Sequence, residues 1–249
     1  MTAALPNRIP TDSLSYRSGD PRQRLIVALD VSTAAAAHKI VAAVGDSALT
    51  YKVGMQLYTA VGPQIVRDLV ASGRRVFLDL KYHDIPNTVG AAVAEAEKLG
   101  VSMLTIHAAG STKMVRAAVD AAKVRPDLMV LAVTVLTSMD GHDLETIGIR
   151  GSVEDSVVRL ATIALAQGCQ GVVTSAREAS TLRSKLGDRF ALVTPGVRPA
   201  GSSMEDQVRV VTPAEAIASG ASHIVVGRPI TEAADPAAEA RAILGQIRS

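Results

Sequence analysis

From Arg24 onward, short runs of β-branched and aliphatic residues alternate with longer, Ala-rich segments of helical periodicity. The first run, Arg24–Asp30 (RLIVALD), is apolar almost throughout, as is typical of a strand that is covered on both faces. Similar runs recur at intervals near the ~30 residues of a strand-plus-helix unit. The pattern predicts eight strands, which begin near Arg24, Leu49, Arg75, Ser102, Leu128, Gly171, Phe190 and Ser222.

The segments between these runs carry the start and stop signals of helices. One amphipathic helix is expected to begin at Gly62-Pro63 and to end at Gly73. Others are expected to begin at pairs that resemble capping boxes or at a proline, namely Ser152/Asp155, Ser175/Glu178, Thr212/Glu215 and Asp235-Pro236. Strands that alternate with helices indicate a parallel sheet, and eight such units predict a single-domain α/β protein of the (β/α)8 TIM barrel class. An open doubly wound sheet is the alternative, but no GxGxxG follows the first strand.

The domain organisation is predicted to be simple. Residues 1–22 are rich in Pro, Ser and Arg and are expected to be a surface or flexible extension, and residues 23–249 are expected to form the catalytic barrel. Two predicted loops are unusually long, Thr137–Gly151 and Pro195–Val210. Both follow strands, so we expect them at the carboxyl-terminal face, where barrels carry their active sites.

Composition narrows the class of function. The 249 residues are 48% hydrophobic and 20% charged, and 26 Lys+Arg against 24 Asp+Glu leave a net charge of +2. With two Phe, four Tyr and no Trp, the chain offers neither the charge nor the stacking platform of a nucleic-acid-polymer binder. No membrane span and no secretory signal are expected. The single cysteine, Cys169, fits a reducing cytoplasm and reads as a small buried hydrophobe.

Charged residues gather where the predicted strands end. Asp30 follows the first strand, Lys52 lies in the second, and Asp79 and Lys81 end the third, with Asp84 on the next loop. Because side chains alternate along a strand, Asp79 and Lys81 should face the barrel mouth. The aliphatic residues of the same strand, Val76, Leu78 and Leu80, should then face the helices. A catalytic charge array is the favoured interpretation, and a purely structural salt-bridge network is the alternative.

A phosphate site is predicted after the last strand. Gly227 allows a close approach of the backbone to an anion, and Arg228 offers a bidentate donor. Phosphate sites after strands seven and eight recur in this architecture, and Arg198 and Gln207 on the preceding long loop favour one here. A turn glycine beside a solvated arginine is the alternative. His83 and His107 are interpreted as structural, and no motif for a metal is present.

The segment DLKYHDIPNT (Asp79–Thr88) resembles the signature of the orotidine 5'-phosphate decarboxylase family. Further matching pieces follow in the same order, namely VALD, YKVG, LTSM, PGVRP and VVGRPI. The resemblance extends from Arg24 to the carboxyl terminus. It implies a cofactor-free enzyme without a metal, which converts orotidine 5'-phosphate into uridine 5'-phosphate and carbon dioxide in the last step of de novo UMP biosynthesis.

The resemblance also implies a role for each site residue. Lys81 is the proton donor to C6 of the pyrimidine, in an array with Lys52, Asp79 and Asp84. Asp30 and Lys52 bind ribose hydroxyls, and Thr137 contacts the base. The family is homodimeric, and Asp84, Ile85 and Thr88 are expected to enter the site from the partner subunit. The residues expected to bind or close over the phosphate are Arg198, Gln207, Gly227 and Arg228.

Two other classes remain open. One is a metal-dependent sugar-phosphate decarboxylase or aldol-type synthase on the same barrel, because the Asp-x-Lys-x-x-Asp core is shared with such enzymes. The other is a phospho-ligand-binding barrel without catalysis. The complete set of Asp79, Lys81 and Asp84 disfavours a mere binding protein, which has no need for an alternating charge array.

Overall fold

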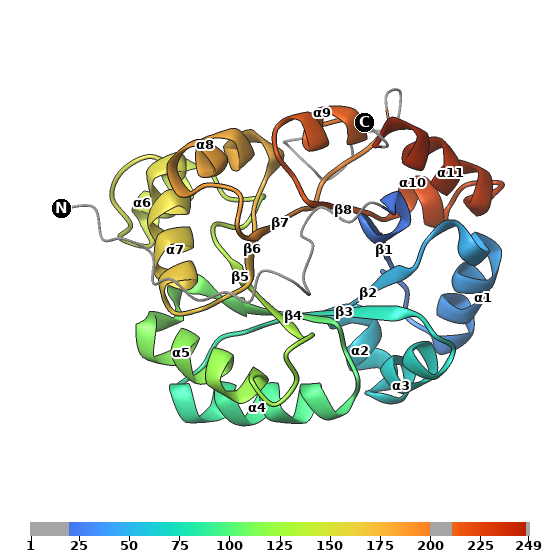
Figure 1. Cartoon of the computed structure of the whole chain (residues 1–249), viewed down its shortest axis with the longest axis horizontal. Coiled ribbons are helices and arrows are strands. Elements are labelled where there is room, and N and C mark those ends of the chain that lie inside the picture. Colours follow the sequence, from blue (N-terminus) through green and yellow to red (C-terminus); the bar gives the residue numbers. More distant parts are fainter. Residues whose placement is uncertain (1–19, 200–210, 248–249) are drawn as a thin grey trace.

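The computed structural model describes residues 20–199 and 211–247, which form a closed barrel of eight parallel strands in sequential order (Figure 1). The predicted single-domain (β/α)8 barrel is therefore confirmed. Each strand begins within one residue of its predicted start. The strands are β1 (Leu25–Ala28), β2 (Thr50–Gly54), β3 (Arg75–Tyr82), β4 (Met103–His107), β5 (Met129–Val133), β6 (Gly171–Val173), β7 (Ala191–Thr194) and β8 (His223–Val226).

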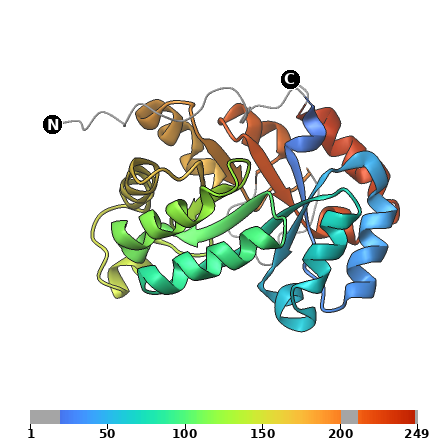
Figure 2. The ribbon, with the colours of Figure 1, turned by 60° about the horizontal axis from the view of Figure 1, so that its bottom comes forward.

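Helices surround the barrel, and α4 and α5 lie side by side against its outside (Figure 2). The α-helices are α1 (Ala34–Val44), α2 (Met55–Val61), α3 (Gln64–Ala71), α4 (Pro86–Lys98), α5 (Ser111–Ala122), α6 (Gly141–Thr146), α7 (Val153–Ala166), α8 (Ala176–Leu186), α9 (Pro213–Ala218), α10 (Arg228–Thr231) and α11 (Pro236–Gln246). The described residues also form three short 3-10 helices, η1 (Pro21–Gln23), η2 (Gly45–Ser47) and η3 (Ala108–Gly110). Among the helices of this described part, none is long and apolar enough to cross a membrane.

The predicted helix starts are largely confirmed. Thr212 and Glu215 form a reciprocal capping box at α9, and Ser152 caps α7 by accepting the backbone N–H of Asp155. Ser175 caps α8 differently, because it accepts the N–H of Arg177, one residue earlier than in a capping box. Such caps satisfy backbone donors that the first helical turn leaves without partners.

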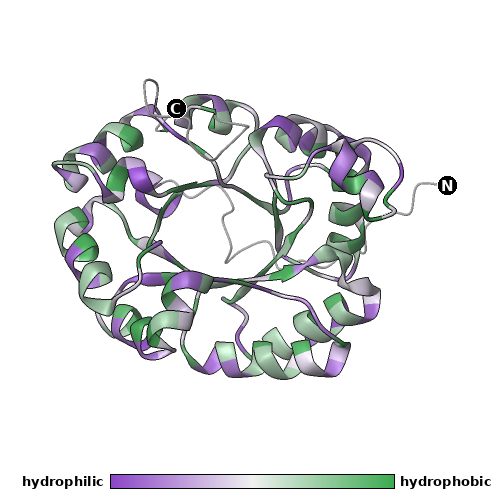
Figure 3. Cartoon of the chain, turned by 180° about the vertical axis from the view of Figure 1, so that it is seen from behind, coloured by the Kyte–Doolittle hydropathy of each residue, from purple (hydrophilic) through white to green (hydrophobic). Residues whose placement is uncertain are grey.

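Two apolar layers position the site. The outer layer lies between strands and helices, and the inner layer fills the barrel with Ile26, Ala28, Phe77, Met103, Met129, Leu131, Ala191, Val193 and Val225. The strands are mostly hydrophobic, with charged exceptions such as those on β3, while the helices carry many hydrophilic positions (Figure 3). Because apolar side chains fill the interior of the barrel, polar groups gather above this inner layer, at the carboxyl ends of the strands.

The two long loops differ from their predicted form. The Thr137–Gly151 segment is not a plain loop, since it contains α6, which begins with a capping box between Asp140 and Asp143. Of the second segment, Pro195–Val210, only residues 195–199 are described, and Val211 directly follows it. There Val197 and Val211 form a parallel bridge, and the N–H of Arg198 donates to the carbonyl of Val211 over 3.0 Å.

Candidate active site

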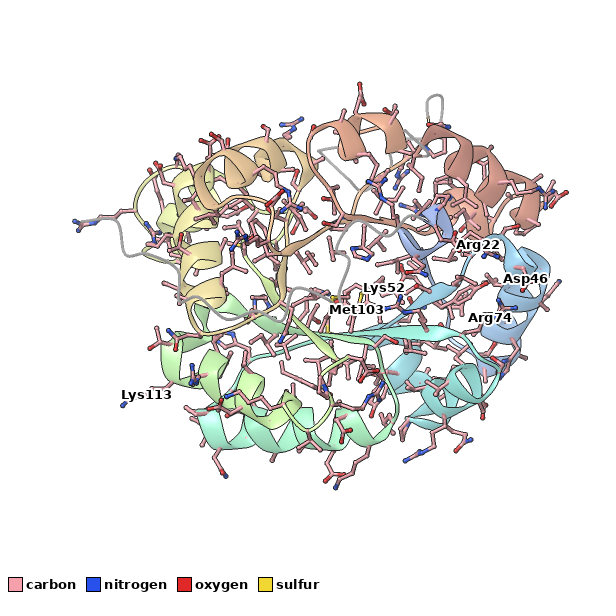
Figure 4. The ribbon with its side chains drawn as sticks, viewed as in Figure 1. Arg22, Asp46, Lys52, Arg74, Met103 and Lys113 are labelled. Carbon is pink, nitrogen blue, oxygen red and sulfur yellow. The ribbon has the colours of Figure 1, made fainter. Side chains whose placement is uncertain are left out.

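Four charged side chains form a continuous chain at the carboxyl ends of the first three strands. Lys52 Nζ lies 2.9 Å from Asp30 Oδ1 and 3.8 Å from Asp79 Oδ2. Lys81 Nζ lies 2.9 Å from the same Asp79 oxygen. Lys52 and Met103 both lie within the ring of strands (Figure 4). Acidic and basic groups therefore alternate in the order Asp30, Lys52, Asp79, Lys81, as the sequence predicted.

Burial increases toward the middle of this chain. The side chains of Lys52 and Asp79 are 12% and 13% exposed, that of Lys81 is 24% exposed, and that of Asp30 is 56% exposed. Two cations and two anions in contact cancel in charge, which reduces the cost of removing each from water. Oδ2 of Asp79 contacts the ammonium groups of both Lys52 and Lys81, so Asp79 links the two lysines.

The backbone at Lys81 is not that of a regular strand. Its φ is 52°, in the left-handed region that residues with side chains seldom occupy. The pairing of β3 with β4 also shifts between Leu78 and Tyr82. Alternation placed Lys81 on the correct face, but this irregularity has no signal in the apolar pattern.

Thr105 on β4 is a member of the site that sequence reasoning missed. Its hydroxyl donates to Asp79 Oδ1 over 2.9 Å and accepts the backbone N–H of Lys81 over 2.9 Å. The available signal was a lone polar residue inside the apolar run MLTIH of strand β4. That signal is weak, because threonine is common in strands.

A cavity of about 560 Å³ opens beside this chain at the barrel mouth. Ala28, Phe77, Val133, Val173 and Val225 supply an apolar floor and wall. Thr231 and Glu232 also line it, although the sequence did not single them out. Eight predicted site residues line the cavity together, namely Asp30, Lys52, Asp79, Lys81, Thr137, Arg198, Gly227 and Arg228.

The predicted phosphate-binding residues lie on the β8 side of this cavity. Gly227 precedes α10, and a Cβ atom placed on it would lie 3.8 Å from Asp30 Oδ2 and 3.6 Å from Ala28 Cβ. Arg198 is 7% exposed although it carries a charge, and Arg228 is the first residue of α10. Gln207 lies outside the described residues.

Three predicted residues lie apart from the cavity of their own chain. Asp84, Ile85 and Thr88 are all exposed at the start of α4, and the Ile85 side chain is 65% exposed. Asp84 Oδ1 accepts the backbone N–H of Ile85 over 2.6 Å. Within a single subunit, these residues therefore do not complete the charge chain.

Two further titratable groups of the described residues, His107 and Cys169, have pKa values that burial shifts. The rings of His83 and His107 lie 5.3 Å apart, and burial, followed by the charges of His83 and Lys81, lowers the pKa of His107. Burial raises the pKa of Cys169 to about 12, so its thiol is unreactive, as expected for a buried hydrophobe. No cluster of three metal-ligating side chains occurs within residues 20–199 and 211–247.

Comparison with known proteins agrees with this geometry. Residues 23–243 match the model of the orotidine 5'-phosphate decarboxylase / HUMPS family. The chain is 51% identical to orotidine 5'-phosphate decarboxylase of Afipia carboxidovorans over 92% of this chain and 96% of that protein. It is 50% identical to the protein of the same name from Sodalis glossinidius, over 96% and 94% of the two chains.

Solved structures give the same result. The crystal structure of orotidine 5'-phosphate decarboxylase from Lactobacillus acidophilus superimposes with a TM-score of 0.82 and 37% identity, over 91% of this chain and all of that chain. An uncharacterised conserved protein from Geobacillus kaustophilus gives a TM-score of 0.78 and 34% identity, over 90% and 99%. The chain therefore belongs to the orotidine 5'-phosphate decarboxylase / HUMPS family.

Proposed function

We propose that this protein decarboxylates orotidine 5'-phosphate to uridine 5'-phosphate and carbon dioxide, in the biosynthesis of pyrimidine nucleotides. The observation that carries the proposal is the alternating chain of Asp30, Lys52, Asp79 and Lys81 along one cavity. Relatives with about half of their residues identical, over nearly their full length, bear the name of this enzyme. A purely structural network would not need an open cavity beside it.

The cavity suits a mononucleotide in size and polarity. Its volume of about 560 Å³ lies within the range of roughly 300–1,000 Å³ that is usual for small-ligand sites. Arg198, Gly227 and Arg228 would bind the phosphate, and Asp30 with Lys52 would bind ribose hydroxyls. Thr137, which also lines the cavity, would contact the pyrimidine. In this proposal, C6 of the base would face Lys81.

Lys81 would act as the proton donor. When the bond from C6 to the carboxylate carbon breaks, carbon dioxide leaves and the electron pair remains on C6 as an sp2 carbanion. The ammonium of Lys81 stabilises this charge as it forms and then transfers a proton to C6, which leaves a neutral amine that regains a proton from water. Asp79 holds Lys81 Nζ at 2.9 Å in this scheme, so the donor is oriented before the substrate binds.

The phosphate would contribute although it is remote from C6. Binding energy from a non-reacting part of a substrate can be used to order a loop and to expel water from the reacting end. Arg198 lies near the start of the long segment after β7, and its backbone N–H already donates to the carbonyl of Val211. We propose that this segment, with Gln207, closes over the bound phosphate.

The complete site would need two subunits. Asp84, Ile85 and Thr88 are exposed and do not line the cavity of their own chain, which favours a role across a homodimer interface. If a partner covered the side chain of Ile85, which is 65% exposed, apolar surface would be removed from water, which is favourable. The proposal also includes the domain organisation, with an extension of residues 1–22 and a catalytic barrel of residues 23–249. We further propose that the enzyme is cytoplasmic and needs no cofactor.

A direct assay tests this function. Purified protein is mixed with orotidine 5'-phosphate and EDTA, and the loss of substrate absorbance is followed while uridine 5'-phosphate is identified by chromatography. We expect full turnover in the chelator, which also separates this enzyme from a metal-dependent sugar-phosphate decarboxylase or synthase. Absence of turnover, or turnover that EDTA abolishes, would overturn the proposal.

A further inference from the structure

Thr105 occupies a gap in the pairing between β3 and β4. Leu78 pairs with Leu104 and Tyr82 pairs with Ile106, so three residues of β3 lie opposite Thr105 alone. The side chain of Thr105 is fully buried at this point. A buried hydroxyl is costly unless it is hydrogen-bonded, so the partners of this one are part of what stabilises the gap.

The two hydrogen bonds of this hydroxyl have a fixed direction. The backbone N–H of Lys81 can only donate, so Thr105 Oγ1 accepts there over 2.9 Å. The hydroxyl carries one hydrogen, and it is directed to Asp79 Oδ1 over 2.9 Å. One side chain therefore binds both members of the ion pair, the carboxylate through its oxygen and the lysine through its backbone.

This double contact determines where the charges point. With Oδ1 of Asp79 bound to Thr105, Oδ2 is left to Lys81 Nζ at 2.9 Å and to Lys52 Nζ at 3.8 Å. The N–H contact also lies at the residue whose backbone has a φ of 52°. A lysine held in that conformation needs stabilising contacts, and the Thr105 hydroxyl supplies one of them.

We propose that Thr105 is a positioning residue for the decarboxylation, whose hydroxyl sets the direction of the Lys81 ammonium by holding Asp79 and the Lys81 backbone together. Thr105 does not line the cavity, so it acts through these two residues rather than on the substrate. The inference rests on the proposed function, because it assigns a role in that reaction. Replacement of the hydroxyl by a methyl group keeps the volume of the side chain but removes both hydrogen bonds.

Three variants test this role, namely Thr105→Val, Thr105→Ser and Thr50→Val. Thr50 is a matched control, because it is a fully buried strand threonine whose hydroxyl has no hydrogen-bond partner among the described residues. For Thr105→Val we expect kcat to fall about 10²-fold, a loss that a misplacement of the reacting group by about 1 Å can cause. We expect KM to change by less than about threefold, because the phosphate contacts are untouched. Thr105→Ser and Thr50→Val should retain nearly the wild-type kcat.

The outcomes separate this inference from the proposed function. A wild-type protein without turnover overturns both. A wild-type protein with turnover and a Thr105→Val variant of equal kcat overturns only the role of Thr105, and so does a variant that changes KM alone. Circular dichroism accompanies each variant, and Thr105→Ala replaces a Val variant that does not fold. Thr105→Ser keeps the hydroxyl, so a folded Thr105→Ser variant with the low kcat expected for Val also overturns the role.

Discussion

Oδ2 of Asp79 lies 2.9 Å from the ammonium of Lys81, and the two residues are two positions apart on the same face of β3. Because a strand returns a side chain to one face every second residue, this spacing places both charges at the barrel mouth. The pair is only partly exposed, and Lys52 approaches the same carboxylate oxygen from β2. The ammonium that we assign as proton donor is thus held from one side before the substrate enters.

Replacement of Lys81 by alanine should abolish turnover while the fold stays intact. Loss of both the stabilising charge and the proton donor is expected to lower kcat by at least about 10³-fold. Steady-state kinetics measures the loss, and calorimetric binding of uridine 5'-phosphate verifies that the site is still formed. Lys113→Ala is the matched control, because Lys113 is an exposed lysine on α5, remote from the cavity (Figure 4). Substantial residual decarboxylation by Lys81→Ala would refute its assignment as proton donor.

Replacement of Arg228 by alanine should affect the phosphate and little else. A hydrogen bond to a charged group contributes about 1.5–3 kcal/mol, so kcat/KM for orotidine 5'-phosphate should fall roughly 10- to 100-fold. The same variant should process orotidine, which lacks the phosphate, as well as the wild-type enzyme does. Free phosphite should accelerate the reaction of orotidine in the wild-type enzyme more than in the variant. An equal loss with both substrates would contradict the phosphate role.

The dimeric site can be tested by mixing two inactive variants. If Asp84 acts in the partner's cavity, a heterodimer of Lys81→Ala and Asp84→Asn contains one complete site and one site that lacks both residues. Random mixing of subunits should then restore roughly a quarter of the wild-type activity, because half of the dimers are mixed and each has one working site. Subunits are mixed under reversible dissociation and assayed afterwards. If Asp84 acts in its own chain, no activity returns.

Much of the fold followed from the apolar pattern because barrel strands are covered on both faces. Runs such as RLIVALD are therefore continuous, and they marked every strand start to within one residue. The α6 helix was missed because six residues are too short to show helical periodicity, although Asp140 and Asp143 were a usable capping signal. Short helices of this kind are determined by local capping and by packing rather than by an amphipathic stripe.

The site was predictable where it depends on strand ends and not where it depends on pairing between strands. Asp30, Lys52, Asp79 and Lys81 follow from alternation and from their positions at the ends of three runs. The contact of Thr105 with this group depends on a shift in register between β3 and β4, which is a long-range property. No local pattern in either strand encodes such a shift.

Arg183 is expected to contribute to stability and not to catalysis. Its guanidinium donates to the carbonyls of Gly187, Phe190 and Gly220 and to the hydroxyl of Ser222, and it lies over the ring of Phe190 at 4.5 Å. Replacement by methionine leaves several of these acceptors without a partner, which should cost about 2–4 kcal/mol of the free energy of unfolding.

Urea unfolding measures this loss, and kcat at a temperature where the variant is folded should be unchanged. Arg177→Met is the matched control on the same helix, because Arg177 is exposed to solvent. A variant of Arg183 as stable as this control would contradict the structural role.

His223 should make the fold sensitive to mild acid. Burial, followed by the charges of Arg75 and Arg24, lowers the pKa of His223 to about 3, and its Nδ1 has no hydrogen-bond partner among the described residues. His223 binds a proton near pH 6.5 in the unfolded chain but not in the folded chain, so above pH 6.5 its titration costs the fold no stability. As the pH falls from 6.5 toward 3, the free energy of unfolding decreases progressively, by at most about 1.4 kcal/mol per pH unit.

Replacement of His223 by leucine removes this dependence and leaves the other titrating groups in place. Thermal melts of both proteins between pH 7.5 and pH 4.5, a window that we choose to span the unfolded-state pKa, give the difference in Tm at each pH. Because the pKa of His107 is also lowered by burial, only this difference isolates His223. We expect the Tm of the wild-type protein to fall relative to that of the variant below pH 6.5. Parallel curves would show that His223 binds its proton equally well in the folded and unfolded states.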